Sequence, residues 1–308
     1  MPIASANGLE ICYETFGNPA DPPLLLVMGL GAQMIAWDEE FCRALADRGF
    51  YVIRFDNRDC GLSSKIEGGP VPNPAAAMGG DTSSAAYRLS DMAGDAVGLL
   101  DALGIDKAHI VGASMGGMIV QTIAINHPDR VLSMASIMST TGGPEVGRAT
   151  PEALAALLAP RPTTREEAIE AAMKGRAITG ASPGFPFDEA KARAFVAASY
   201  DRSNYPIGMA RQLVAIMASG DRTEGLKSVK VPTVVVHGEA DVLVTPSGGH
   251  ATAVAIPGAK LVTMPGHGSW AAAGRLAGGD RRHCRKYTAR LTPASSCRCQ
   301  VDRRGLKP

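Results

Sequence analysis

Short apolar runs alternate with helical segments along most of the chain, and this alternation limits the folds that it can adopt. The runs are continuous rather than interleaved with polar residues, which is typical of strands buried on both faces of a parallel sheet. Helical segments such as 37–48, 89–103 and 115–126 connect them as crossovers. We therefore expect an α/β fold with a mostly parallel central sheet flanked by helices. The expected strands lie at 24–28, 51–56, 108–111, 132–138, 231–236 and 259–264.

The alternation stops between residues 141 and 220, where helical stretches are separated by glycine and proline and no strand is indicated. We interpret this interval as a helical cap inserted into the core. The core is then discontinuous, with a first part at 1–140 and a second part at 221–267. A chain of 308 residues with 45% hydrophobic side chains has room for one large core of this kind.

Composition excludes several classes of partner. The net charge of +1 gives no electrostatic basis for binding nucleic acid. No apolar run reaches the length of a membrane span, and the N-terminus lacks the basic and apolar regions of a signal peptide. We expect a cytoplasmic protein with no membrane partner, and the cysteine spacing predicts no metal site. An oligomer is neither indicated nor excluded.

The stretch Gly112-Ala113-Ser114-Met115-Gly116 lies between an expected strand and an expected helix. It has the Gly-x-Ser-x-Gly pattern of a nucleophile elbow, a strained turn that lifts its serine above the sheet. Gly112 and Gly116 are expected because the strand and helix backbones approach closely there. A plain strand-to-helix turn is the alternative interpretation of the pattern by itself.

A serine nucleophile needs a base and an orienting acid. His267 is the favoured base because it follows the last expected strand, at the sheet edge where catalytic groups gather. The acid should follow the preceding strand, where Asp241 comes just before an apolar segment and Glu239 is the alternative. Ser114, Asp241 and His267 then form a triad in the order serine, acid, histidine. The other histidines have structural or surface interpretations: His109, His127, His237, His250 and His283.

Two backbone N–H groups are expected to stabilise the oxyanion that forms when the serine attacks. One is the N–H of Met115, which follows the nucleophile at the start of a helix. The other comes from the glycine-rich loop at 28–32, where we favour the N–H of Leu30. Candidate walls of the substrate pocket, each of a residue type more often found in a core, are Met34, Trp37, Met209 and Met217.

Together with several further motifs, these features make the chain resemble the α/β-hydrolase superfamily. The resemblance extends from Gly8 to His267. The stretches that carry the resemblance are FDNRDCGLS at 55–63, DMAGD at 91–95, LLDALG at 99–104 and HPDRV at 127–131. Val27-Met28-Gly29 and Asp59 make the chain most similar to the branch of small-molecule esterases that contains aclacinomycin methylesterase.

The resemblance implies a serine carboxylesterase that acts on short- to medium-chain esters through an acyl-enzyme, without a cofactor or metal. Lactonases, carbon–carbon bond hydrolases and perhydrolases share the triad, so they are alternatives within the family. A non-catalytic receptor for small ligands, built on the same fold, is the alternative from another class.

Residues 268–308 depart from the rest of the chain. They contain ten Lys or Arg and two Asp, a net charge of +8, whereas the remainder carries −7. One codon choice for residues 279–288, read one base later, encodes Ala-Ile-Val-Ala-Ile-Ala-Glu-Asn-Thr, an apolar segment that suits a final helix. We hypothesise that this tail arises from a frameshift near the codon of His267, which the nucleotide sequence of the gene would test. A basic surface tail that binds a partner is the competing interpretation.

Overall fold

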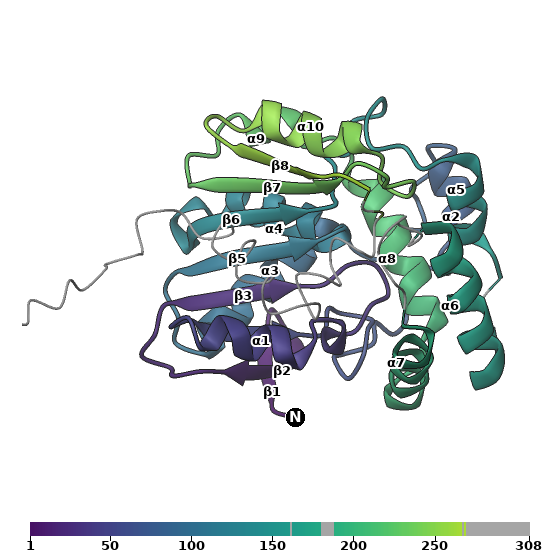
Figure 1. Cartoon of the computed structure of the whole chain (residues 1–308), viewed down its shortest axis with the longest axis horizontal. Coiled ribbons are helices and arrows are strands. Elements are labelled where there is room, and N and C mark those ends of the chain that lie inside the picture. The colour runs from purple at the N-terminus through teal and green to yellow at the C-terminus, as the bar shows by residue number, and fades with distance from the viewer. Residues whose placement is uncertain (161, 180–187, 267, 269–308) are drawn as a thin grey trace, which may run out of the picture.

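An eight-stranded sheet forms the centre of the molecule (Figure 1). The computed structural model describes residues 1–160, 162–179, 188–266 and 268. The strands are β1 (Ile3–Ala6), β2 (Leu9–Phe16), β3 (Pro23–Val27), β4 (Tyr51–Phe55), β5 (Ala108–Ala113), β6 (Val131–Ile137), β7 (Thr233–Gly238) and β8 (Lys260–Met264). Their order across the sheet is β1-β2-β4-β3-β5-β6-β7-β8. β1 and β2 pair antiparallel with their neighbours, and the pairs from β4 to β8 are parallel.

The predicted strands correspond to β3–β8, so the α/β fold with a mostly parallel sheet is confirmed. The hairpin of β1 and β2 is not among the predicted elements. Its turn is Asn7-Gly8, where φ is 51° and 76°. An Asn-Gly dipeptide with both residues at positive φ is the preferred turn of a two-residue hairpin, so this dipeptide is the signal that reveals it.

The helices of the described residues alternate with the strands and also form an insertion. They are α1 (Glu39–Ala46), α2 (Pro74–Met78), α3 (Leu89–Ala102), α4 (Met115–Asn126), α5 (Pro151–Leu158), α6 (Arg165–Thr179), α7 (Glu189–Arg202), α8 (Pro206–Ser219), α9 (Thr223–Leu226) and α10 (Pro246–Ala255), with short 3-10 turns η1 (Met34–Ala36) and η2 (Pro128–Arg130). The predicted helix at 115–126 has the bounds of α4. The helix predicted at 37–48 is shorter, because the side chain of Asp38 accepts a hydrogen bond from Glu40 N–H at 2.9 Å and caps α1.

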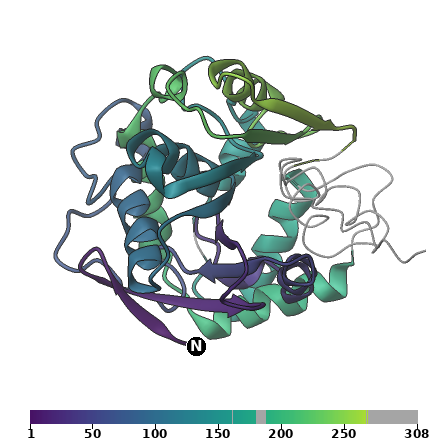
Figure 2. The same cartoon turned by 90° about the vertical axis from the view of Figure 1, so that its left-hand side faces the viewer.

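Helices cover both faces of the sheet (Figure 2). α1 packs on one face, where Phe41 joins Leu24 and Leu26 of β3 in one apolar core. α3 and α4 pack on the other face, where Met92 and Leu25 belong to a second core. Successive residues of β3 therefore enter opposite cores, which explains why the strand is a continuous apolar run.

The chain changes direction across the sheet between β3 and β5. From β3 it passes to β4 on one side, whereas from β5 it passes to β6, β7 and β8 on the other side. β3 and β5 are nevertheless hydrogen-bonded neighbours. In open α/β sheets, ligands bind at the carboxyl ends of the strands at such a switch point. The loops that follow β3 and β5 meet there.

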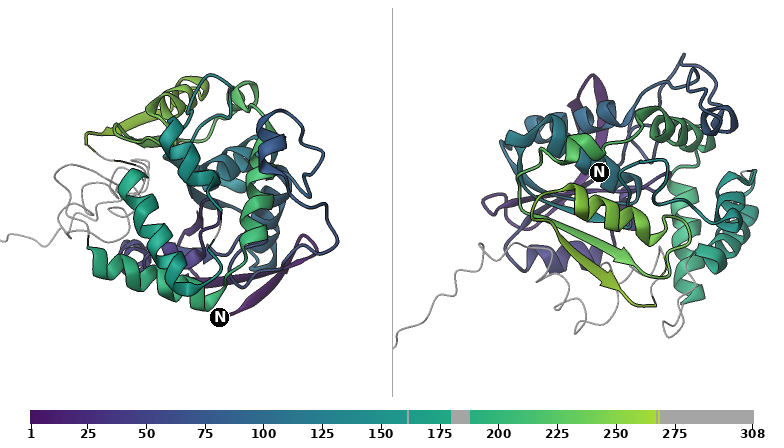
Figure 3. Two further views of the ribbon diagram at one scale, coloured as in Figure 1. Left: turned by 90° about the vertical axis from the view of Figure 1, so that its right-hand side faces the viewer. Right: turned by 90° about the horizontal axis from the view of Figure 1, so that it is seen from above.

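Helices α5–α8 stand together at one end of the sheet (Figures 1 and 3). They lie between β6 and β7 in the sequence, inside the interval predicted for the cap. α8 approaches the core closely, since a Cβ atom on Gly208 would lie 2.1 Å from the carbonyl oxygen of Asp59. These helices, α5–α8, which we call the cap, therefore rest on the loop that follows β4.

The tail predicted at 268–308 lies outside the described residues, except for Gly268. Among the described residues, no helix is both long and apolar enough to cross a bilayer.

Candidate active site

Ser114 occupies the turn between β5 and α4 in a strained backbone conformation. Its φ is 56° and its ψ is −120°, a region that residues other than glycine adopt at a cost. Hydrogen bonds fix the turn: Ser114 N–H donates to the carbonyl oxygen of Ile137 at 2.9 Å, and Ser139 Oγ donates to the carbonyl oxygen of Ser114 at 2.9 Å. The surrounding structure therefore holds the serine at the switch point of the sheet.

Gly112 and Gly116, the two glycines predicted for the elbow, lie where the backbones of β3, β5 and α4 come close together. A Cβ atom on Gly112 would lie 2.1 Å from the carbonyl oxygen of Gly116. A Cβ atom on Gly116 would lie 2.1 Å from the carbonyl oxygen of Val27 in β3. Real Cβ atoms do not approach a backbone oxygen this closely, so both positions require glycine.

Replacing Gly112 by alanine should destabilise the fold severely. The new methyl group would meet backbone atoms of Gly116, which cannot move without displacing α4. We expect Gly112→Ala to lower the free energy of unfolding by about 3 kcal/mol or more, measured by urea denaturation. The matched control is Gly175→Ala in α6, where no atom lies within 4 Å of the added Cβ. That change should be neutral or stabilise by about 0.5–1 kcal/mol. Equal stability of the two variants would contradict the steric role of Gly112.

The loop of residues 28–33, which we call the oxyanion loop, passes directly beside Ser114. A Cβ atom on Gly29 would lie 3.1 Å from Ser114 Cβ and 3.6 Å from Ser114 Oγ. The loop is closed by a turn in which Ala32 N–H donates to the carbonyl oxygen of Gly29 at 3.2 Å. The N–H group of Gly31 donates to Gln212 Oε1 of α8 at 2.8 Å.

Two backbone donors are left near the serine. Among the residues that the structure describes, the N–H groups of Leu30 and Met115 donate to no protein acceptor. Met115 is the first residue of α4, where the helix dipole and unpaired N–H groups favour a negative charge. These are the two groups that the sequence analysis assigns to the oxyanion hole.

Asp241 and Glu239 lie in the loop after β7 but in different surroundings. Glu239 is exposed, whereas Asp241 is 3% exposed. Asp241 Oδ1 accepts hydrogen bonds from the N–H groups of Leu243 and Val244, each at 2.9 Å. The carboxylate is therefore fixed in one orientation, which favours Asp241 over Glu239 as an orienting acid.

The predicted base, His267, lies outside the described residues. The described chain reaches its neighbourhood, since β8 ends at Met264 and the carbonyl oxygen of that residue accepts the N–H of Glu239 at 3.1 Å. The loop that holds Asp241 and the segment that leads to His267 are thus joined at the same edge of the sheet as Ser114.

The histidines within the described residues have structural positions. His109 in β5 lies 2.7 Å from Ser133 Oγ through Nδ1, and burial lowers its pKa. His237 at the end of β7 lies 2.7 Å from the carbonyl oxygen of Val244 through Nε2, and this nitrogen is 3.7 Å from Asp241 Oδ2. His127 caps the C-terminus of α4, and His250 is exposed on α10.

The four predicted pocket walls have different surroundings. Met209 of α8 lies against the oxyanion loop, because a Cβ atom on Gly31 would be 2.9 Å from its Cγ. Met34 is fully buried, and Trp37 stacks on Phe41 in the core at a ring distance of 5.8 Å. Met217 is 37% exposed near the end of α8. Met209 is therefore the wall residue that a direct contact places beside the site.

The segment 56–63, which carries part of the family resemblance, links the core to the cap. Asp59 has a φ of 61° and its Oδ2 accepts a hydrogen bond from the hydroxyl of Tyr87 at 2.9 Å. Burial, reinforced by the nearby Asp59 carboxylate, raises the pKa of Tyr87, so the phenol stays a donor. Arg211 of α8 lies 3.4 Å from Asp59 Oδ1 and 3.2 Å from the hydroxyl of Tyr205.

The polar residues by which the cap holds the site loops are not predicted from the sequence. Gln212 contacts the oxyanion loop from α8, and Arg202 at the end of α7 contacts Asp56 and Gln33. The pairing of these residues has no local signal, because each partner lies more than a hundred residues away. A buried glutamine or arginine inside an amphipathic helix is the signal that remains.

Comparison with known proteins places the chain in a family. Residues 22–273 match the family model of the alpha/beta hydrolase fold, so the chain belongs to the α/β-hydrolase family and is an enzyme of that class. The chain is 27% identical over 286 residues to rhodomycin D methylesterase DauP of Streptomyces sp. (strain C5), covering 86% of this chain and 91% of that protein.

Two lactonases show a similar relationship. 3-Oxoadipate enol-lactonase 2 of Acinetobacter baylyi is 25% identical over 245 residues, which covers 80% of this chain and 81% of that protein. The crystal structure of the enol-lactonase from Burkholderia xenovorans LB400 superimposes with a TM-score of 0.71 at 26% identity. That superposition covers 94% of this chain and 99% of the lactonase.

Proposed function

We propose that the chain hydrolyses small carboxylic esters with acyl groups of short to medium length. The observation that carries this proposal is the position of Ser114, held at a φ of 56° at the switch point of the sheet, next to Met115 and beside the loop that carries the N–H of Leu30. A strained serine next to two donors without a protein acceptor suits attack on a carbonyl carbon.

In the proposed first step, Ser114 forms an acyl-enzyme. The hydroxyl of Ser114 gives its proton to His267, and its oxygen bonds to the carbonyl carbon of the ester. The carbonyl oxygen becomes an oxyanion, which accepts hydrogen bonds from the N–H groups of Leu30 and Met115. The bond to the alcohol oxygen then breaks, and the proton on His267 passes to the departing alcohol.

In the second step, water releases the acid. His267 takes a proton from the water, whose oxygen bonds to the acyl carbon. The bond to Ser114 Oγ breaks and the proton returns to that oxygen, which regenerates the serine. Asp241 orients the imidazole and stabilises its cationic form, a role that its buried and doubly hydrogen-bonded carboxylate supports.

The relatives support ester chemistry and suggest a second candidate substrate. The names of the similar proteins describe a methylesterase and enol-lactonases, which both open an ester linkage. A lactone is a cyclic ester, so the same serine, base and oxyanion donors would open it. Carbon–carbon bond cleavage, perhydrolysis and ligand reception without turnover are the other outcomes that the experiment has to separate.

A panel of substrates tests the proposal. p-Nitrophenyl acetate, butyrate and octanoate, methyl esters of aromatic acids and a series of lactones would be incubated with the purified chain. We expect catalytic turnover with at least one ester class, with release of alcohol and acid in equal amounts. Stoichiometric binding with no turnover on any ester or lactone would instead support the receptor, and faster reaction with lactones than with open-chain esters would make the chain a lactonase.

A further inference from the structure

The cap holds the oxyanion loop through one buried amide. Gln212 lies in α8 with no exposed surface, and its Oε1 accepts the N–H of Gly31 at 2.8 Å. Its Nε2 donates to the carbonyl oxygen of Arg58 at 2.8 Å. A single cap side chain therefore joins the loop after β3 to the loop after β4, and both of its polar atoms are used.

This contact determines which N–H group of the loop is left for a ligand. In a trans peptide the C=O and N–H groups point in opposite directions. The carbonyl of Gly29 accepts the N–H of Ala32 at 3.2 Å, so the N–H of Leu30 points away from that turn. The next N–H, that of Gly31, is taken by Gln212.

The conformation around Gly31 makes the loop depend on this amide. Gly31 has a φ of 64°, and glycine adopts positive and negative φ about equally well. The peptide between Leu30 and Gly31 can therefore rotate with little steric resistance unless its N–H is bonded. That rotation would turn the carbonyl of Leu30 and the N–H of Gly31, and it would loosen the loop directly next to the predicted donor, the N–H of Leu30.

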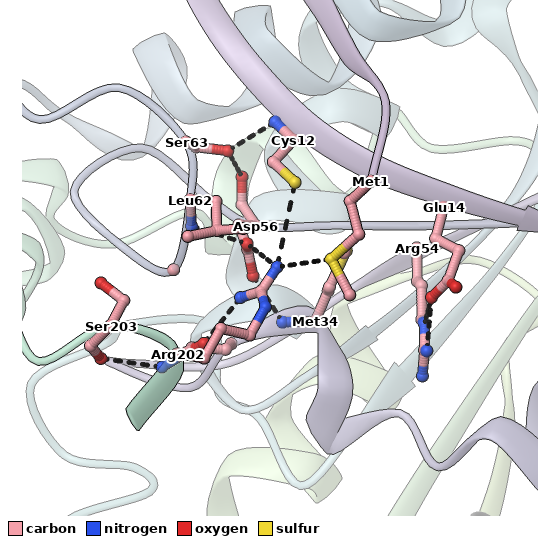
Figure 4. A network of polar contacts seen from close by, with 12 residues as sticks. Met1, Cys12, Glu14, Met34, Arg54, Asp56, Leu62, Ser63, Arg202 and Ser203 are labelled. Carbon is pink, nitrogen blue, oxygen red and sulfur yellow. Dashed lines mark hydrogen bonds and ion pairs between the residues drawn. The ribbon is translucent and has the colours of Figure 1, made fainter. Parts of the chain in front are cut away.

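A second set of contacts fixes the far end of the same loop (Figure 4). Arg202 of α7 reaches into the core, where its Nη2 lies 2.7 Å from Asp56 Oδ2 and its Nη1 donates to Gln33 Oε1 at 2.6 Å. Asp56 Oδ1 in turn accepts the N–H of Met34 at 2.7 Å. With this end fixed to the cap, Gln212 controls the remaining freedom at Gly31.

We propose that Gln212 is a positioning residue for the oxyanion hole, which it holds in shape from the cap by its hydrogen bonds to Gly31 N–H and to the carbonyl oxygen of Arg58. The inference rests on the proposed ester hydrolysis. Gln212 does not touch the reacting atoms and acts through the backbone of the oxyanion loop. Loss of its contacts should weaken binding of the transition state more than binding of the substrate.

The test is Gln212→Met, which keeps the length of the side chain and removes both hydrogen bonds. On the best ester of the panel, we expect kcat to fall about 10- to 100-fold while KM changes less than about threefold. Affinity for a trifluoromethyl ketone, which Ser114 converts to a tetrahedral oxyanion, should fall by about the same factor as kcat/KM.

The matched control is Gln121→Met in α4. Gln121 is also fully buried and also uses both polar atoms, with Ser136 Oγ and Arg222 Nε each at 3.2 Å. It should lose stability to a similar extent while kcat and ketone affinity stay within about twofold of wild type. If Gln212→Met does not fold, Gln212→Asn carries the same test, because its amide is too short to span both partners.

The outcomes separate the two claims. Ester turnover by the wild-type chain with unchanged kcat and ketone affinity in the Gln212 variant would overturn the positioning role alone. An equal fall of kcat in Gln121→Met would overturn it as well, since the effect would then follow from loss of stability. No turnover by the wild-type chain would overturn the proposed function, and this inference with it.

Discussion

Ser114→Ala should remove ester hydrolysis almost completely. The substitution deletes the oxygen that bonds to the acyl carbon, so no acyl-enzyme forms, and the base, the acid and the oxyanion donors are left without a nucleophile. We expect kcat/KM for p-nitrophenyl butyrate to fall by a factor on the order of 10^4 to 10^6, measured by release of p-nitrophenolate. The fold should persist, because alanine occupies the same strained turn that the serine does and the backbone bonds to Ile137 and Ser139 are retained.

A buried serine on the neighbouring strand gives the control. Ser133 of β6 is 6% exposed, and its Oγ lies 2.7 Å from His109 Nδ1. It pairs in register with His109, five residues before Ser114, so it lies away from the carboxyl edge of the sheet. Ser133→Ala should keep kcat/KM within about threefold of wild type. Turnover by Ser114→Ala at the wild-type rate, in a sample with no contaminating esterase, would refute the serine mechanism.

The turn at Ser114 was predictable because the residues that mark it lie close together in the sequence. Gly112 and Gly116 lie within two residues of Ser114, although the backbone oxygen that excludes a side chain at Gly116 belongs to Val27 in β3. The order of strands and helices follows in the same way from apolar runs that must enter two cores. Sequence patterns of this range record the packing of neighbouring segments directly.

The cap contacts were not predictable, because they join residues that only the folded chain brings together. Gln212 and Gly31 are 181 residues apart, and Arg202 and Asp56 are 146 residues apart. A glutamine in an amphipathic helix has no local feature that identifies its partner. The preference for Asp241 over Glu239 lies between these two cases and can be predicted in part. Asp241 accepts hydrogen bonds from the N–H groups two and three residues after it, a short-range pattern that aspartate favours in turns.

Asp241→Asn tests that choice and should have the second largest effect on activity. The asparagine retains the oxygen that accepts from Leu243 and Val244, so the loop after β7 should keep its conformation. Its amide carries no negative charge to stabilise the imidazolium of His267, and it favours the wrong tautomer of the base. We expect kcat to fall by a factor on the order of 10^3 to 10^4 in steady-state assays.

Glu239→Gln is the matched control on the exposed side of the same loop, and it should change kcat less than about twofold. The reverse pattern, with Glu239→Gln inactive and Asp241→Asn active, would assign the acid to Glu239. In that case the exposed carboxylate of Glu239, rather than the buried carboxylate of Asp241, would have to reach the base.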